Sequence, residues 1–304
     1  VNDDLERHEG MLVTITGPGG TGKTRLGREY GRRYIAAGTG ELWFVDLTRS
    51  EDLEGFLAAT ASSLSIVLGP THSAAQNADE IGEWLSRRGP LLLILDNFEQ
   101  IVDSSAEVLS RWLSRASECC FLVSSREVLR LEGEHVLALG PLPLPRTSED
   151  ALGSEAVQLF LERAKAVRPN LQLSPAELTV VGKISQLLEG IPLAIELAAA
   201  RIAVMGPVQL LERLSKSMDV LSSGRRDASP RQATLRGAME WSWRLLKPVE
   251  QSALPQISVF RGGFALAEAE RVLALPSGVS GTPLVIDVLQ ALADKSLLRA
   301  DPQS

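Results

Sequence analysis

The sequence is poor in cysteine, histidine and aromatic residues. Of its 304 residues, two are cysteines, which are adjacent at Cys119 and Cys120, and three are histidines, His8, His72 and His135. Metal sites made of cysteine and histidine need three or four ligands, so two neighbouring thiols and three scattered imidazoles argue against one. So few cysteines favour a reducing compartment. We expect a cytoplasmic protein whose thiols pack as small apolar side chains where a strand begins.

The sequence also lacks a hydrophobic run long enough for a membrane span. The longest mostly apolar stretch, residues 191–205, contains Glu196 and Arg201, whereas about 20 apolar residues are needed to cross a bilayer. No signal peptide opens the chain, which begins at Val1 without a methionine. We therefore expect no membrane partner, and we interpret the sequence as a piece of a longer protein.

Charge of one sign is not in large excess. The formal net charge is -7, with 23% charged and 44% hydrophobic residues, which is typical of a soluble globular protein. A mildly acidic chain does not bind nucleic acid through its bulk electrostatics. Any phosphate that it binds must be held by a local arrangement of residues.

Such an arrangement is present near the start of the chain. Residues 17–24 match the P-loop pattern G-x-x-x-x-G-K-[ST], with an apolar, β-branched run before them and helical spacing after them. The glycines allow a tight turn whose N–H groups point at phosphate oxygens, and the following helix presents its positive end to the same anion. Lys23 is expected to contact the β- and γ-phosphates, and the Thr24 hydroxyl to bind Mg²⁺. The predicted nucleotide-binding residues of this loop are Gly17, Gly19, Gly20, Thr21, Gly22, Lys23, Thr24 and Arg25.

A second magnesium ligand is predicted where the wholly apolar run 91–95 ends. Asp96 follows this run, which is the Walker B arrangement of a buried strand that ends in a carboxylate. The next residue, Asn97, is an amide that cannot act as a general base, so we expect slow hydrolysis. Glu99 either polarises the attacking water or is a solvated residue at the start of a helix.

A cation is predicted at the end of the next strand. Arg126 follows the apolar run 121–125, and a cation at a strand end that faces the P-loop can sense the γ-phosphate of ATP. The alternative is an ordinary surface arginine. The predicted catalytic residues are Lys23, Asp96, Glu99 and Arg126.

The order of the elements predicts three domains, at 1–145, 146–225 and 226–304. Apolar runs alternate with helical spacing in the first part, which is typical of a parallel sheet covered on both faces. Residues 140–145 alternate proline with other residues and predict an extended linker, after which the periodicity is helical. A second linker is predicted at 222–229. The expected strands are 11–16, 42–47, 91–95, 121–125 and 136–139.

These pieces, in this order, resemble the STAND class of signal-transduction ATPases, which includes the NB-ARC proteins. The resemblance is strongest to bacterial regulators whose ATPase is fused to DNA-binding, kinase or cyclase modules, and it covers nearly the whole chain. It depends on the P-loop, the run LLLILDNFEQ at 91–100, SSRE at 124–127, the segment 141–160, GIPL at 190–193, TLR at 234–236, WSW at 241–243, SVFRGGF at 258–264 and DKSL at 294–297.

The resemblance implies an α/β P-loop domain, a helical domain and a mostly helical, winged-helix domain that is incomplete here. It implies ATP or ADP with Mg²⁺ as the ligand, effector and sensor domains outside this piece, a nucleotide-dependent homo-oligomer, and DNA contact only through a fused domain. It also implies that Pro192 packs near the adenine. The alternative is that Gly190 ends one helix and Pro192 begins the next, and both can hold. Two family motifs, a glycine-arginine segment before the P-loop and a nucleotide-sensing motif after the winged helix, are absent from this sequence.

The function that we predict is an ATP/ADP-binding switch of a bacterial multidomain regulator, in which slow Mg²⁺-dependent ATP hydrolysis controls domain arrangement or oligomerisation. One alternative is a P-loop phosphotransferase, although no lid insert interrupts the first domain. Another is a regulator that binds DNA directly through the winged helix. A GTPase is disfavoured because no Asn-Lys-x-Asp motif is found. The DNA-binding alternative would use a basic cluster made of Arg225, Arg226, Arg231, Arg236, Arg244 and Lys247.

Overall fold

The computed structural model describes residues 12–145, 152–221, 235–260, 263–276 and 283–298. The chain forms two compact units, which we treat separately. The first contains residues 1–18, 23–139 and 247–304, and the second contains residues 19–22 and 140–246. The three-domain division that we inferred from the sequence stays a prediction.

The first unit is built on a five-stranded parallel sheet. Its strands lie in the order β2-β3-β4-β1-β5, and every described pairing between them is parallel. The three inner strands are almost completely buried, as expected for a parallel sheet with helices on both faces. Their bounds are β1 Leu12–Thr16, β2 Glu41–Asp46, β3 Leu91–Asp96, β4 Cys119–Ser124 and β5 Glu134–Ala138.

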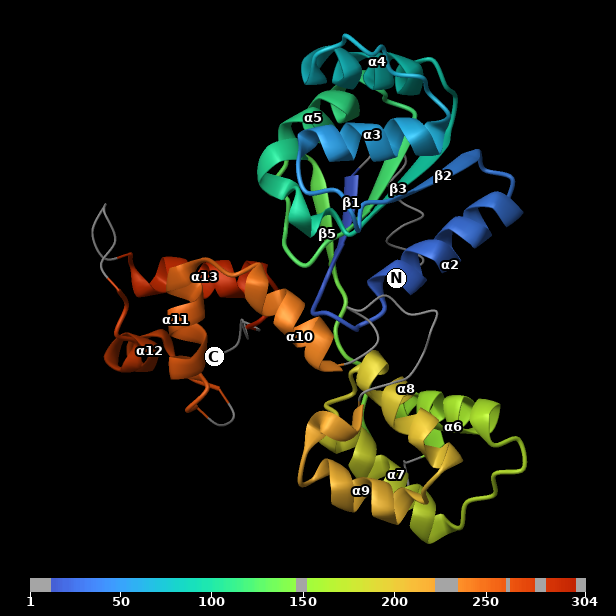
Figure 1. The fold of residues 1–304 in the computed structure, drawn as a ribbon, viewed down its shortest axis with the longest axis vertical. Coiled ribbons are helices and arrows are strands. Elements are labelled where there is room, and N and C mark those ends of the chain that lie inside the picture. The colour runs from blue at the N-terminus through green and yellow to red at the C-terminus, as the bar shows by residue number, and fades with distance from the viewer. Residues whose placement is uncertain (1–11, 146–151, 222–234, 261–262, 277–282, 299–304) are drawn as a thin grey trace. The chain divides into compact units, whose positions relative to one another are not determined.

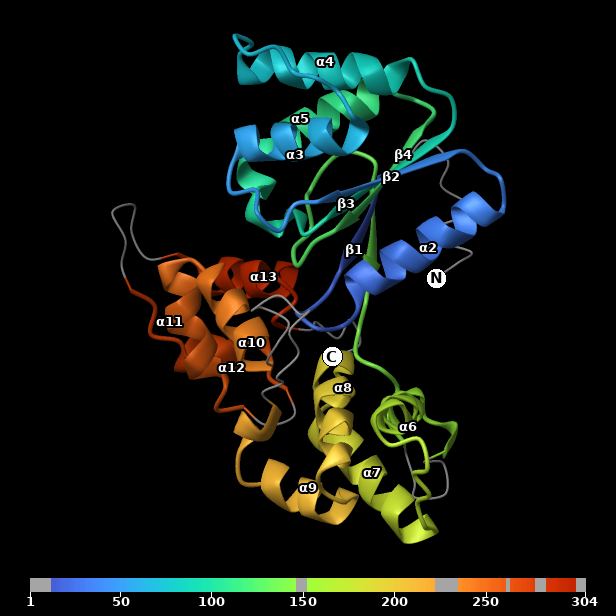
Figure 2. The same ribbon diagram turned by 45° about the vertical axis from the view of Figure 1, so that its right-hand side comes forward.

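The two faces of the sheet have separate cores because side chains alternate along each strand. Leu91, Leu93 and Leu95 point into a core shared with helices α3, α4 and α5, whereas Leu92 and Ile94 pack against α2 on the other face. Figures 1 and 2 show this layering, with α2 alone on its side of the sheet. The helices are α2 Lys23–Ala36, α3 Leu53–Leu64, α4 Ala74–Ser86 and α5 Val102–Arg115.

Three further helices, α11–α13, belong to the same unit. A buried ion pair joins α11 to the end of α13, with 2.7 Å between Lys295 Nζ and Glu250 Oε2. A reciprocal pair of hydrogen bonds between Gln256 and the backbone of Ala274 ties α11 to the residues after α12. Their bounds are α11 Pro248–Ile257, α12 Leu266–Val272 and α13 Val285–Asp294.

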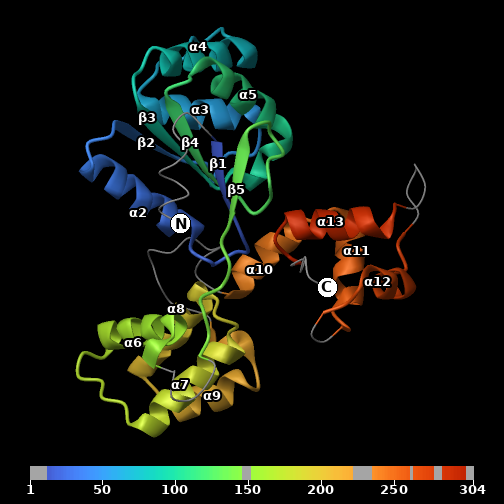
Figure 3. The same cartoon turned by 180° about the vertical axis from the view of Figure 1, so that it is seen from behind.

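The second unit is a helical bundle around one core, visible from behind in Figure 3. A capping box begins the helix at 175–187, because the Ser174 hydroxyl accepts from the Glu177 N–H while the Glu177 carboxylate accepts from the Ser174 N–H. The proline-rich segment is held to the bundle by the Leu142 N–H, which donates to the Gly190 carbonyl at 2.9 Å. The helices are α6 Glu155–Val167, α7 Pro175–Leu187, α8 Pro192–Ala200, α9 Pro207–Leu214 and α10 Leu235–Arg244.

The predicted fold class is confirmed: a parallel P-loop sheet is followed by a mostly helical remainder. Helix α8 ends at Ala200 and continues as the 3₁₀ helix Arg201–Ala203. Within the described ranges, no helix is both long and apolar enough to cross a membrane. The predictions for His8, the linker 222–229, Arg225, Arg226, Arg231 and the segment 261–262 lie outside the described residues. The winged helix stays a prediction.

Candidate functional site

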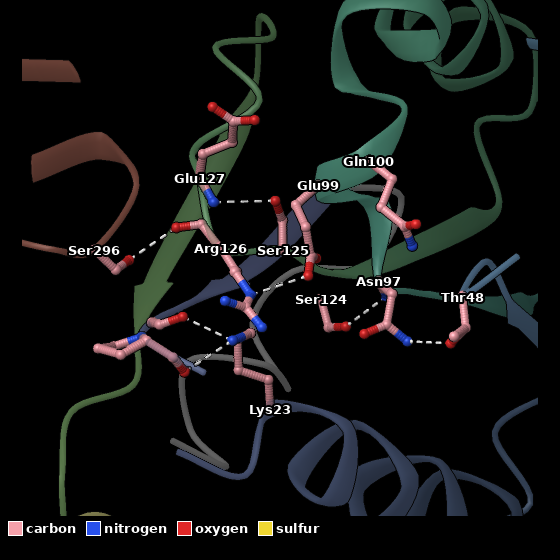
Figure 4. A network of polar contacts seen from close by, with 12 residues as sticks. Lys23, Thr48, Asn97, Glu99, Gln100, Ser124, Ser125, Arg126, Glu127 and Ser296 are labelled. Carbon is pink, nitrogen blue, oxygen red and sulfur yellow. Dashed lines mark hydrogen bonds and ion pairs between the residues drawn. The ribbon is translucent and has the colours of Figure 1, made fainter. Parts of the chain in front are cut away.

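The candidate site lies where the parallel strands of the first unit end. Because these ends meet at one edge of a parallel sheet, the residues after β1, β3 and β4 come together although they are far apart in sequence. Figure 4 shows this edge, with Lys23, Glu99 and Arg126 close to one another. The same edge carries Asn97 and Ser124.

The P-loop follows β1 and leads into α2. Gly17, Gly20 and Gly22 have φ values of 149°, 87° and 100°, a region that favours glycine. The Lys23 ammonium folds back and donates to the carbonyls of Gly17 at 2.7 Å and Pro18 at 3.1 Å. Burial lowers the pKa of Lys23 to about 8, partly offset by the carboxylates of Glu99 and Asp96.

Thr24 and Asp96, the two predicted magnesium ligands, lie side by side. The Thr24 hydroxyl donates to Asp96 Oδ1 at 2.9 Å, and the Ser124 hydroxyl donates to the same oxygen. Burial raises the pKa of Asp96, although both hydroxyl donors oppose that rise. Ser124 was not predicted as a site residue. Its signal is its place at the end of β4, the strand that pairs with both β1 and β3.

Asn97 holds Asp96 in place. Its backbone is left-handed, with φ 67°, and its side-chain amide donates to Asp96 Oδ2 at 3.2 Å and to the Thr48 hydroxyl at 3.0 Å. Its N–H donates to the Ser124 hydroxyl at 3.0 Å. The Asn97 side chain is thus directed toward Thr48, whereas the Glu99 side chain lies near Lys23 (Figure 4).

Glu99 and Arg126 form a buried ion pair. Arg126 Nε donates to Glu99 Oε1 at 3.2 Å, and the two side chains are 12% and 5% exposed. The sequence left open that Glu99 is a solvated residue and that Arg126 is a surface arginine. Both of these alternatives are wrong, because the two side chains are buried. Glu99 lies in the 3₁₀ helix η1, Phe98–Gln100. Its second oxygen is buried without a hydrogen-bond partner among the described residues, which is costly for a carboxylate.

The Thr24 hydroxyl and the Asp96 carboxylate fit Mg²⁺ that is bound together with a nucleotide. They do not fit a metal ion whose ligands all come from the protein. No group of three or more His, Cys, Asp or Glu residues that could hold a metal occurs among the described residues. Magnesium in nucleotide sites takes one or two carboxylates and completes its octahedron with phosphate and water oxygens. A hydroxyl and a buried carboxylate 2.9 Å apart beside a phosphate-binding loop supply that partial shell. A cation there would also stabilise the charged form of Asp96.

The remaining predicted residues are placed as follows. Thr21 is buried, whereas Arg25 is exposed. Pro192 begins α8 two residues after Gly190, whose φ is 70°, so the helix-boundary interpretation is confirmed. The role of Pro192 beside adenine stays a prediction.

Gly20 contacts α8 within the second unit. The Leu193 N–H donates to the Gly20 carbonyl at 3.1 Å. A Cβ at Gly20 would lie 2.8 Å from the Leu193 Cβ, whereas a Cβ at Gly22 would meet nothing within 4 Å. Both glycines have positive φ, so only the contact distinguishes them.

We expect Gly20→Ala to lower the free energy of unfolding by about 2–4 kcal/mol, because backbone strain and overpacking add. Gly22→Ala, the matched control, should cost only the strain of about 1–2 kcal/mol. Urea unfolding of both variants measures the difference. Equal losses would show that α8 does not pack on Gly20.

The parallel sheet, the loop after β1 and the carboxylate after β3 define a P-loop NTPase fold. Consistent with this, the family model described as "AAA domain" matches residues 6–128. The narrower assignment to the STAND class stays a prediction.

Two proteins of Mycobacterium tuberculosis are similar in sequence. One, named "Putative HTH-type transcriptional regulator", is 35% identical over 297 residues, which cover 96% of this chain and 31% of that protein. The other, named "Uncharacterized protein", is 32% identical over 261 residues, covering 86% of this chain and 63% of that protein. The chain therefore spans about a third of the first relative and less than two thirds of the second.

Among solved structures, the Aeropyrum pernix ORC2 protein, titled as ADPNP-ADP complexes, has a similar fold. The TM-score is 0.52 at 14% sequence identity, and the match covers 96% of this chain and 81% of that chain. At this identity the similarity concerns the fold alone.

Proposed function

We propose that this chain is an ATP/ADP-binding switch that hydrolyses ATP slowly with Mg²⁺. The observation that carries the proposal is the hydrogen bond that the Thr24 hydroxyl donates to the Asp96 carboxylate at 2.9 Å. Thr24 is the last residue of the P-loop pattern, and Lys23 precedes it. The P-loop residues Gly17, Gly19, Gly20, Thr21, Gly22 and Arg25 surround the phosphates, mainly through backbone N–H groups. On binding, Lys23 exchanges its two carbonyl partners for phosphate oxygens.

Thr24 and Asp96 would hold Mg²⁺, directly or through water, and the ion would supply positive charge beside the phosphates. Asn97 and Ser124 orient the Asp96 carboxylate through their hydrogen bonds. These two side chains set the direction of the metal-binding oxygens and take no part in the reaction.

Glu99 is proposed to polarise the attacking water, and Arg126 to contact the γ-phosphate. Glu99 and Arg126 neutralise each other, so a γ-phosphate at Arg126 would compete with Glu99 for the guanidinium. This competition, together with an amide at position 97, accounts for slow turnover. The difference between ATP and ADP is then one phosphate, and its contacts supply the differential free energy of a switch.

Adenine is proposed to lie near Pro192. The next residue, Leu193, donates its N–H to the Gly20 carbonyl. Pro192 and P-loop residues 19–22 therefore belong to the same compact unit. Regulatory output would come from effector and sensor domains outside this sequence, or from nucleotide-dependent oligomers. The name of the mycobacterial relative, an HTH-type transcriptional regulator, supports DNA contact through such a fused domain.

Equilibrium titration with labelled ATP and ADP tests the proposal, with GTP as competitor and a turnover assay beside it. We expect both adenine nucleotides to bind with Mg²⁺, GTP to compete weakly, and turnover to stay well below the median of roughly 10 per second for enzymes. Turnover at ordinary enzyme rates, with small-angle scattering indifferent to nucleotide, would favour the phosphotransferase. Equal competition by GTP would overturn the adenine preference.

We expect Asp96→Asn to remove the magnesium dependence of ATP binding while sparing metal-free ADP binding, because the amide is a poor ligand for Mg²⁺ but keeps the size of the side chain. Titrations with and without Mg²⁺ measure this. Asp79→Asn is the matched control, since Asp79 is an exposed aspartate on α4 whose partners are Arg111 and Arg115. An unchanged magnesium dependence in Asp96→Asn would make Asp96 a structural residue.

A further inference from the structure

The short helix η1, which carries Glu99, presents three different sides to its surroundings. Side chains three residues apart lie on the same side of a 3₁₀ helix, so Asn97 and Gln100 share one side. Phe98 occupies the second side and is fully buried in the core shared with α3, α4 and α5. Glu99 occupies the third side and pairs with Arg126. In Figure 4 the Glu99 side chain lies toward Arg126, and the Gln100 side chain lies away from it.

The side of η1 that faces away from Arg126 is bound to residues 46–48, which we call the β2 anchor. The Gln100 side-chain amide donates from Nε2 to the Leu47 carbonyl at 3.1 Å. The Asn97 side-chain amide donates from Nδ2 to the Thr48 hydroxyl at 3.0 Å. The residues on both sides of Phe98–Glu99 are therefore tied to the same short segment.

The β2 anchor is fixed by hydrogen bonds of its own. The Thr48 N–H donates to the Asp46 carboxylate at 2.9 Å, and the Thr48 hydroxyl donates to the same carboxylate. Leu47 is fully buried, its N–H donates to the Asp96 carbonyl at 2.9 Å, and its carbonyl also accepts from the Ser50 N–H at 3.0 Å. The groups that receive the two amides thus have a defined position.

The donors and acceptors in this arrangement require an amide at position 97. The single proton of the Thr48 hydroxyl is donated to Asp46, so this hydroxyl can only accept from residue 97. Asp96 Oδ2, the other partner of the Asn97 amide at 3.2 Å, is also an acceptor. A carboxylate at position 97 would present acceptors to both partners, whereas an amide donates to both.

Glu99 needs such support to stay in the site. Its Oε2 is buried and has no hydrogen-bond partner among the described residues, which is costly for a carboxylate. A helix of three residues has little stability of its own, and its backbone bond from the Ile101 N–H to the Phe98 carbonyl is 3.0 Å long. Turning Glu99 out to water would relieve the burial cost, and the bond from Gln100 opposes that movement.

We propose that Gln100 is a positioning residue of the hydrolysis site. Its bond to the Leu47 carbonyl, with the bond from Asn97 to Thr48, holds Glu99 where it polarises the attacking water. This inference rests on the proposed role of Glu99. Gln100 acts through Glu99 alone, so its loss slows hydrolysis and does not weaken nucleotide binding.

Gln100→Met tests the positioning, because methionine keeps the length of the side chain and removes the donor. We expect single-turnover ATP hydrolysis to fall by about tenfold or more, the usual effect of losing an outer hydrogen-bond partner, with the ATP dissociation constant unchanged or lower. Unchanged hydrolysis would overturn the proposal. A loss of ATP affinity as large as the loss of hydrolysis would place Gln100 in the binding site and overturn it equally.

Gln158→Met is the matched control. The Gln158 amide also donates from Nε2 to a backbone carbonyl at 3.1 Å, that of Leu152, and it lies in the second unit. The two substitutions therefore delete the same kind of hydrogen bond. We expect Gln158→Met to hydrolyse and bind ATP as the parent does, and an equal fall in hydrolysis in both variants would show that the effect is not specific to Gln100.

A double-mutant cycle with Glu99→Gln tests whether Gln100 acts through Glu99. Residues that act as one unit give non-additive losses. We expect Gln100→Met to slow hydrolysis in the parent chain and to slow it no further in the Glu99→Gln chain. The same fold loss in both backgrounds would show that Gln100 acts independently of Glu99, and the proposal would be wrong.

Hydrogen exchange of the nucleotide-free, full 304-residue chain measures the hold on η1 without any turnover. We expect Gln100→Met and Thr48→Val, which each remove one of the two side-chain bonds, to raise exchange at residues 97–101. Gln158→Met should leave exchange there unchanged. Unchanged exchange in both site variants would show that the β2 anchor does not hold η1. A parent chain that hydrolyses no ATP would overturn the proposed function and the positioning of Glu99 with it, while exchange would still decide whether Gln100 holds η1.

Discussion

Lys23→Ala is expected to weaken ATP and ADP binding by about a hundredfold. Loss of one partner from a buried charged contact costs about 2–5 kcal/mol, and 1.4 kcal/mol corresponds to a tenfold change in affinity. The lysine is the cation at the end of the P-loop, and its ammonium reaches the Gly17 and Pro18 carbonyls. Titration with labelled nucleotide measures the loss, and unchanged affinity would refute the P-loop assignment.

The same variant should melt at or above the temperature of the parent. Burial lowers the pKa of Lys23 from 10.5 to about 8, so below pH 8 the folded chain holds a charge that is more stable in the unfolded chain. The lysine thus opposes folding at neutral pH, and its removal relieves that cost. Lys183→Ala, at an exposed position of α7, is the control and should change neither binding nor melting. A large drop in melting temperature for Lys23→Ala would instead give the lysine a structural role.

Glu99→Gln is expected to reduce ATP turnover by roughly a hundredfold or more, the usual effect of losing a general base, with ATP affinity unchanged or higher. The glutamine keeps the size of the side chain, and its carbonyl can still accept from Arg126 Nε. It no longer neutralises the guanidinium, so ATP competes more easily for Arg126. Single-turnover hydrolysis and equilibrium titration separate the two effects.

Glu107→Gln is the control for this variant, because Glu107 is an exposed carboxylate on α5, and its turnover should equal that of the parent. If Glu99→Gln hydrolyses ATP at the parental rate while its preference for ATP over ADP changes, Glu99 acts only as the partner of Arg126. The fraction of the side chain that is exposed, 5%, already excludes the solvated residue that the sequence left open.

The strands and the P-loop of the first half could be predicted from the sequence, because they depend on local rules that need no tertiary information. Apolar runs separated by helical spacing predicted all five strands to within a few residues. For the three inner strands, the reason is that strands buried on both faces lack polar alternation. Gly17 to Thr24 could be interpreted from the residue types alone, since positive φ and phosphate contact select glycine locally. The capping box at Ser174 and Glu177 is equally local, because its two partners are three residues apart.

What the sequence determined by itself is therefore the P-loop, the strand order along the chain and Asp96 as a strand-end carboxylate. The tertiary structure decided which distant groups meet: Thr24 with Asp96 across 72 residues, Arg126 with Glu99 across 27, and Ser296 with Arg126 across 170. Spacing along a chain records backbone conformation and burial, whereas an ion pair depends on which strand ends and loops the fold brings together. For that reason the sequence leaves the role of Glu99 open. Its burial and its ion pair with Arg126 follow from the pairing of β3 with β4, which brings the residues after these two strands together.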